Sequence, residues 1–156
     1  MALRAILLAC GLLLCLGDQA AIARPLPDGG VTAQEMSEVL KAGGYPIEMT
    51  SFDGNPAINT SVNGIKFSVH FFECDPGGRC QSILFSSSWS IAGITPARMQ
   101  DWNRTKRFGR GYLSEQGTPF VEMDMDFHHG ATTEALISNL DRWKLVVKEF
   151  PTYFRR

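Results

Sequence analysis

Two closely spaced cysteines are the first residues of this sequence that could carry chemistry. Cys74 and Cys80 enclose the segment 75–79, DPGGR, and lie between two apolar runs. A zinc site normally needs four ligands, and the C-x-x-C spacing of a redox motif is absent. If the chain is exported, an even pair of cysteines is most simply a disulfide. We therefore predict a structural disulfide between Cys74 and Cys80. Free or regulatory thiols, and hence a redox sensor, are the alternative.

A second group of side chains could bind a metal. Asp124, Asp126 and His128 follow one another at steps of two, which places them on one face of a strand, and His129 is adjacent. Three oxygen and nitrogen ligands suit zinc or another divalent cation. The opposing interpretation is a solvated turn after the outward face of a strand. We favour that interpretation and predict no cofactor, with a metal-binding protein or metal-dependent enzyme at these residues as the alternative.

A basic cluster is the third candidate. Arg104, Lys106, Arg107 and Arg110 follow the predicted second helix. They could bind an anionic ligand or an acidic partner. Cations are also favourable at a helix C-terminus, where they oppose the helix dipole. Arg104, Arg107 and Arg110 are therefore candidate binding residues.

No residue arrangement typical of an enzyme is found. The serine run 86–88 lacks the G-x-S-x-G elbow of serine hydrolases, and His70 on the neighbouring predicted strand has no evident acid to orient it. We therefore expect a protein without catalytic residues.

The N-terminus has the layout of a secretory signal. Arg4 precedes an apolar run over residues 5–16, and residues 21–23, Ala-Ile-Ala, suit signal cleavage. The run is shorter than the roughly 20 residues that a spanning helix needs. Cleavage would remove Cys10 and Cys15, leaving one cysteine pair; a retained membrane anchor is the alternative. We predict a signal peptide at 1–23, a flexible leader at 24–30, and a single domain at 31–154 that is periplasmic or secreted.

The charge balance argues against one class of partner. The chain has a net charge of −1, whereas a nucleic-acid-binding surface is usually accompanied by a basic excess. We therefore expect no nucleic acid among the partners. After signal cleavage, no remaining apolar segment is long enough to span a membrane.

The first elements predicted from the sequence are a helix and a hairpin. The helix covers residues 32–42, where Thr32 and Glu35 form a capping box and two glycines follow. A modest strand is expected at 47–52. Strands at 57–62 and 65–73 flank Asn63-Gly64, the strongest short hairpin signal.

The hairpin turn fixes a register that can be tested against the apolar pattern. It sets Val62 opposite Ile65, Thr60 opposite Phe67, and Ile58 opposite Val69. The predicted core face then holds Ile58, Val62, Ile65, Phe67, Val69 and Phe71. The other face holds Asn59, Ser61, Lys66, Ser68 and His70.

The same register extends to the cysteines. If residues 82–89 pair antiparallel with 65–73, Cys74 lies opposite Cys80. Phe71 then lies opposite Ile83 and Val69 opposite Phe85, both on the predicted core face. The disulfide would therefore close the base of a five-residue loop.

The second half is predicted to contain two helices and a hairpin. Thr95 caps a helix at 95–105, with Pro96 in its first turn and Met99 and Trp102 on one face. Strands at 109–114 and 119–127 flank residues 115–117. On the second strand we expect four core residues, Val121, Met123, Met125 and Phe127, and three solvent-facing acids, Glu122, Asp124 and Asp126.

The last helix is expected to begin at Thr132 or Thr133. Its buried stripe is Leu136, Leu140, Trp143, Val147 and Phe150, and it should end before Pro151. The element order indicates an α+β fold. We predict an antiparallel sheet of five to six strands, with helices at the N-terminus, in the middle and at the C-terminus.

Two segments carry a resemblance to a known family. Residues 99–113, MQDWNRTKRFGRGYL, and 119–127, PFVEMDMDF, followed by a terminal helix with Trp143, resemble the YbjN family, described as bacterial sensory transduction regulators. The matching residues are Trp102, Asn103, Phe108, Arg110, Tyr112, Leu113 and the strand 122–127. The resemblance covers residues 31–154 and carries over no catalytic residues. Trp102, Asn103, Phe108 and Tyr112 are read as a structural motif.

The resemblance also implies a fold and a mode of action. The family is similar in fold to type III secretion chaperones, which are dimeric protein-binding modules. It therefore implies a chaperone-like, bacterial protein-binding module with a possible homodimer. The export signal and the pair Cys74 and Cys80 depart from the cytoplasmic members. We accordingly expect an exported, non-enzymatic binding or regulatory module of the bacterial envelope.

Overall fold

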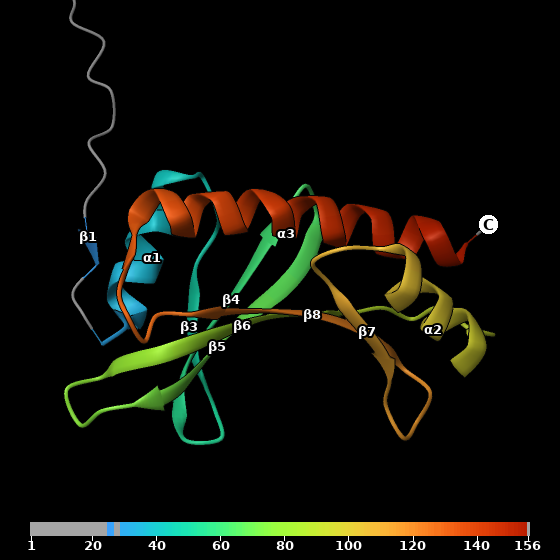
Figure 1. Ribbon diagram of the computed structural model, residues 1–156, viewed down its shortest axis with the longest axis horizontal. Helices are drawn as coiled ribbons and strands as arrows, with labels where there is room; N and C mark the ends of the chain where they lie inside the picture. Colours follow the sequence, from blue (N-terminus) through green and yellow to red (C-terminus); the bar gives the residue numbers. More distant parts are fainter. Residues whose placement is uncertain (1–24, 27–28, 156) are drawn as a thin grey trace, which may run out of the picture.

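The computed structural model describes residues 25–26 and 29–155, so the predicted signal peptide at 1–23 lies outside the described residues. The fold is α+β, as predicted, with three helices packed against an antiparallel sheet (Figure 1). Within the described residues, no helix is both long and apolar enough to span a membrane.

The main sheet has seven strands. Six of them follow the order β3-β4-β5-β6-β8-β7, and the short strand β2 pairs with the start of β6. Their bounds are β2 Val31–Thr32, β3 Glu48–Phe52, β4 Asn55–Val62, β5 Ile65–Cys74, β6 Arg79–Ser88, β7 Arg110–Leu113 and β8 Pro119–Asp126. A separate pair of two-residue strands, β1 Pro25–Leu26 and β9 Ala131–Thr132, joins part of the predicted leader to the chain just before the last helix.

The helices cover one face of the sheet. They are α1 Ala33–Ala42, α2 Pro96–Thr105 and α3 Thr133–Phe154. Helix α3 runs along the sheet, with α1 near its N-terminal end and α2 beside its C-terminal end (Figure 1). Among the described residues, no helix covers the opposite face, and we call it the open face.

The predicted register is confirmed strand by strand. Val62 lies opposite Ile65, and Cys74 lies opposite Cys80. Asn63 and Gly64 both have positive φ, 50° and 77°, as a two-residue hairpin turn requires. The capping box at Thr32 and Glu35 is also present. The apolar side chains of β4, β5, β6 and β8 consequently point towards the helices.

Two tryptophans organise the core. Trp143 of α3 stacks on Phe85 of β6, with the ring centroids 5.7 Å apart. Trp102 of α2 packs edge to face against Phe150 of α3 at 4.9 Å. Both indoles are fully buried, so they fix the two halves of α3 over the sheet.

The predicted end of the last helix is wrong. Helix α3 continues through Pro151 to Phe154, although proline inside a helix loses one hydrogen bond and costs about 3 kcal/mol. Tertiary contacts hold the last turn in place. Phe154 is buried against Phe150, and the Arg98 guanidinium donates to the carbonyls of Tyr153 and Phe154.

Candidate functional site

A row of polar side chains crosses the open face. Glu48, Asn59, Ser68, Ser86, Glu122 and Arg110 lie directly opposite one another, one from each of the six strands in sheet order. The Ser68 hydroxyl donates to Asn59 Oδ1 over 2.9 Å, which ties β4 to β5 on this face. We call these six residues the polar row.

The open face is hollowed around the polar row. The hollow has a volume of about 850 Å³. Aromatic rings lie at its two ends: Phe52 packs edge to face on His70 at 4.3 Å, and Tyr112 stacks on Phe120 at 5.2 Å. Ser61, Lys66 and Ser88 complete the polar floor between them. The hollow therefore offers hydroxyl, amide and charged groups between two apolar ends.

Glu122 lies at the centre of a partly buried hydrogen-bond network. The Tyr112 hydroxyl donates to one carboxylate oxygen and the Arg110 guanidinium to the other, each over 2.8 Å. Glu122 is only 8% exposed, so the prediction that it faces solvent is wrong. Strand alternation placed the residue on the correct face, but its two partners hold the carboxylate against the sheet. Asp124 and Asp126 on the same face are exposed, as predicted.

The network shifts the acid–base properties of both partners. Burial raises the pKa of Tyr112 to about 12, and the hydrogen bond to the charged Glu122 acts in the same direction. The hydrogen bond to Glu122 also raises the pKa of Arg110. Both shifts in pKa favour the protonated forms, the phenol of Tyr112 and the guanidinium of Arg110.

His70 brings an unsatisfied nitrogen to the same hollow. Its Nδ1 is buried without a hydrogen-bond partner among the described residues. Burial lowers the pKa of His70, although the negative charges of Glu122 and Asp53 oppose the shift. Burial thus favours the neutral imidazole of His70 at the edge of the hollow.

The serine run is divided between the two faces. All three serines contribute to the lining of the hollow, but Ser87 is buried and donates to the Lys66 carbonyl over 2.7 Å. The hydroxyls of Ser86 and Ser88 could form hydrogen bonds with a polar segment of a bound chain.

The predicted basic cluster is dispersed. Arg104 pairs with Asp101 on α2, and Arg107 lies over the Phe108 ring. Only Arg110 reaches the open face, where it pairs with Glu122. The three predicted binding residues therefore do not form one site.

The alternative metal site is not assembled. Among residues 25–26 and 29–155, no three His, Cys, Asp or Glu side chains lie close enough to hold a metal ion. Asp126 instead accepts a hydrogen bond from the His128 backbone N–H over 2.7 Å. The carboxylate thereby closes the turn at the end of β8.

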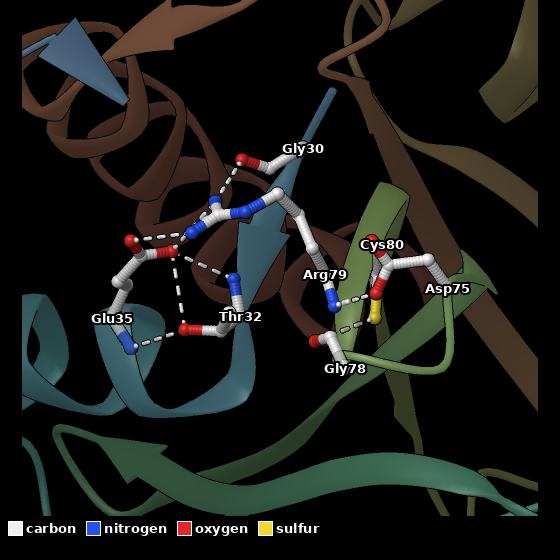
Figure 2. Close-up of polar contacts among 7 residues, drawn as sticks. All are labelled: Gly30, Thr32, Glu35, Asp75, Gly78, Arg79 and Cys80. Carbon is white, nitrogen blue, oxygen red and sulfur yellow. Dashed lines mark hydrogen bonds and ion pairs between the residues drawn. The ribbon is translucent and has the colours of Figure 1, made fainter. Parts of the chain in front are cut away.

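The cysteine pair lies away from the hollow. Cys74 and Cys80 are disulfide-bonded at the end of the β5–β6 hairpin. Beside them, Arg79 donates to the Gly30 carbonyl over 2.9 Å and to the Glu35 carboxylate over 3.1 Å (Figure 2). Burial of Glu35 opposes the change, but the bonds from Arg79 and Thr32 outweigh it and lower its pKa. The crosslinked loop thus holds the chain that enters α1.

The predicted structural motif joins α2 to β7. Trp102 Nε1 donates to the Gly109 carbonyl over 3.1 Å. The Asn103 side chain both donates to and accepts from the Gly111 backbone, over 2.9 and 2.7 Å. Tyr112 lines the hollow, and Phe108 is half exposed to solvent. The four motif residues therefore lie in three different places: the junction of α2 and β7, the hollow, and the surface.

Several residues of the hollow were not predicted as a site. Phe52, Asn59, Ser68, Ser86 and Glu122 come from five strands. The predicted register placed Asn59, Ser68 and His70 together on the polar face of the sheet, but it did not indicate that this face is hollowed. The usable signal was that every second residue of these strands is polar, which places polar side chains on one face of the sheet.

The comparisons with known proteins identify a family. The family model YbjN, described as "Putative bacterial sensory transduction regulator", matches residues 32–156. The chain matches no curated protein and no solved structure. The similarity to type III secretion chaperones thus stays a prediction.

Proposed function

The chain belongs to the YbjN family, and on that premise we propose that it is an exported regulator that acts by binding another protein through its open face. The family description supports a regulatory role. The proposed module is non-enzymatic and works in the bacterial envelope.

The observation that carries the proposal is the hollowed open face. When helices cover only one face of an antiparallel sheet, the other face normally carries solvated polar side chains. This face instead has a hollow of about 850 Å³ with a carboxylate, Glu122, already held by Tyr112 and Arg110. Such preorganised polar groups lower the cost of ordering a surface when a partner binds. Aromatic rings at both ends provide the apolar contacts that interfaces favour.

Export is supported by two features of the sequence. Residues 1–23 have the layout of a signal peptide, and the mature chain would keep a single cysteine pair that is bonded in the structure. A disulfide of this kind persists in an oxidising compartment. N-terminal sequencing of the protein from an envelope fraction should begin at Arg24, and a protein that retains Met1 would contradict the proposal of cleavage.

A crosslinking experiment tests the proposed surface. A photoreactive amino acid replaces Ser86 in the hollow or, as a control, Gln34 on the exposed side of α1. We expect one recurrent protein to be captured from position 86 in living cells and not from position 34. Capture of this chain itself would report the homodimer that the resemblance implies.

A second variant establishes that the hollow itself is required. Ser86→Arg fills the hollow with a long side chain while leaving the helix side unchanged. Crosslinking is then moved to Ser68, on the neighbouring strand. Loss of the captured protein supports binding in the hollow. Undiminished capture, or capture from position 34 alone, would show that the partner binds elsewhere.

A further inference from the structure

One end of the molecule is strongly basic. Residues 96–109 and 141–155 contain eight Lys or Arg and three Asp or Glu, a local excess of five positive charges in a chain whose net charge is −1. These segments are α2, the residues that follow it, and the second half of α3, which lie side by side (Figure 1). Lys106 and Glu149 join them through an ion pair of 3.1 Å. The charge is therefore concentrated in space as well as in sequence.

The acids at this end are already neutralised. Asp101 pairs with Arg104, Asp141 with Lys144, and Glu149 with Lys106. Among the other cations at this end, Arg107, Arg142 and Lys148 are exposed and have no carboxylate partner in the part of the chain that the structure describes. These three cations are thus available to an external anion.

Phe108 organises two of these cations. The guanidinium carbons of Arg107 and Arg142 lie 4.9 and 5.5 Å from the centroid of its ring. Stacking on an aromatic ring holds a guanidinium in place without using all its N–H donors. Arg142 also donates to Asn139 over 3.3 Å, which leaves its other donors free. The two guanidiniums are therefore positioned to bind an anion.

Apolar side chains protrude among the cations. Phe108 is 50% exposed and Leu145 is 63% exposed. Leu145 follows Arg142 by three residues on α3, so the two side chains share one helix face. A surface that combines Lys and Arg with protruding Phe and Leu is typical of proteins that bind the membrane interface.

The exposure of Phe108 is maintained against a conformational cost. Its φ is 74°, in the left-handed region that residues with a Cβ rarely adopt. The next residue cannot move, because Trp102 binds the Gly109 carbonyl and a Cβ on Gly109 would lie 2.6 Å from Val146 Cγ1. Glycine at position 108 would suit this backbone better. A strained conformation that exposes an aromatic ring points to a functional use of that ring.

We propose that this basic end docks on an anionic lipid surface. Phe108 and Leu145 enter the boundary between headgroups and acyl chains, while Arg107, Arg142 and Lys148 contact the lipid phosphates. Lipid is favoured over an acidic protein because the apolar side chains protrude and the cations are long, exposed and spread over α3 and the segment that follows α2. The open face lies on the other side of the sheet from α3, so docking would leave it accessible (Figure 1). This inference does not depend on the proposed function.

Vesicle binding tests the inference. Protein purified from cells is mixed with vesicles of phosphatidylcholine alone or with 30% phosphatidylglycerol, and the bound fraction is measured by sedimentation. The readout is the ratio of binding between the two compositions. Because an uncleaved apolar N-terminus would bind both compositions and bring the ratio of bound fractions towards one, lipid is titrated and the ratio is taken between partition coefficients, in which a contribution common to both compositions cancels. We expect a ratio of about ten or more at low salt, falling as salt is added. A wild-type ratio near one would overturn the inference and direct attention to an acidic protein.

Single charge reversals locate the docking residues. Arg107→Glu and Arg142→Glu should each lower the ratio by roughly five-fold, because each removes one cation from the surface that contacts the lipid. Lys41→Glu, an equal charge change on exposed residue 41 at the end of α1, should leave it unchanged. An equal effect of all three variants would show only a response to net charge and would contradict the inference.

Phe108→Gly separates membrane binding from folding. Because glycine accepts the positive φ, the variant should melt no lower than the wild-type protein. It should nevertheless lose several-fold in binding to the anionic vesicles, as should Leu145→Ser. A Phe108→Gly protein that is folded and binds as well as wild type would contradict a role for this ring. A variant that unfolds would contradict the argument from strain.

Discussion

Arg110 lies directly opposite Glu122 on neighbouring strands and donates to its carboxylate over 2.8 Å. The two side chains differ sharply in environment, since Arg110 is 71% exposed and Glu122 only 9%. The pair joins β7 to β8 on the open face, and Tyr112 completes the shell around the carboxylate. Glu122 therefore joins two strands of the sheet within the surface that we propose to bind a partner.

Glu122→Ala should destabilise the fold because it removes both hydrogen bonds. We expect the free energy of unfolding in urea to fall by about 1–2 kcal/mol. Asp124→Ala is the matched control, since Asp124 is an exposed acid two residues further along the same face of β8. It should change the free energy by less than about 0.5 kcal/mol. Equal effects of the two variants would contradict a structural role for the network.

Gly111→Ala should disrupt the contact between α2, α3 and β7. A Cβ at this position would lie 2.5 Å from Met99 Sδ and 3.0 Å from Trp102. Because these side chains are buried, we expect a loss of about 2–3 kcal/mol in denaturant titrations. Gly77→Ala, in the exposed loop between β5 and β6, serves as a control and should be nearly neutral. Full stability of Gly111→Ala would mean that Met99 can move away freely.

The sheet register could be predicted because independent signals agreed. The Asn63-Gly64 turn, the apolar alternation and the cysteine spacing all require the same pairing, and the structure has it. Local propensity was insufficient at Pro151, where contacts of Phe154 and Arg98 outweigh the loss of a helical hydrogen bond. The sequence pattern therefore predicts elements well where local and long-range preferences coincide.

The candidate site was less predictable for a different physical reason. Alternation identified the face on which Glu122 and Ser86 lie, but the burial of Glu122 depends on two side chains from another strand. Similarly, Arg104 and Arg110 are close in sequence, yet Arg104 lies on α2 and pairs with Asp101, whereas Arg110 lies on the open face and pairs with Glu122. Sites made by side chains from several strands require the sheet order, which no local pattern specifies.

His70 should make stability depend on pH in the acidic range. Its pKa is lowered in the folded protein, so the folded state takes up a proton less readily than the unfolded chain. The stability from neutral His70 is therefore complete above the unfolded pKa of about 6.5 and is lost as the pH falls through the folded pKa. Between pH 7 and 5, the wild-type protein should lose more stability than His70→Gln. An NMR titration that places the His70 pKa above that of an unfolded peptide would contradict this sign.

Replacing both Cys74 and Cys80 by Ser should lower the free energy of unfolding by about 2 kcal/mol, because the disulfide restricts a short loop in the unfolded chain. The neighbouring Arg79 holds Gly30 and Glu35, so the effect should spread to the start of α1. Hydrogen exchange should therefore rise in residues 31–36 and remain unchanged in β7 and β8. Arg79→Ala with the disulfide intact should reproduce the local increase at a smaller cost in stability. A double serine variant with unchanged exchange in residues 31–36 would show that the loop and α1 are independent.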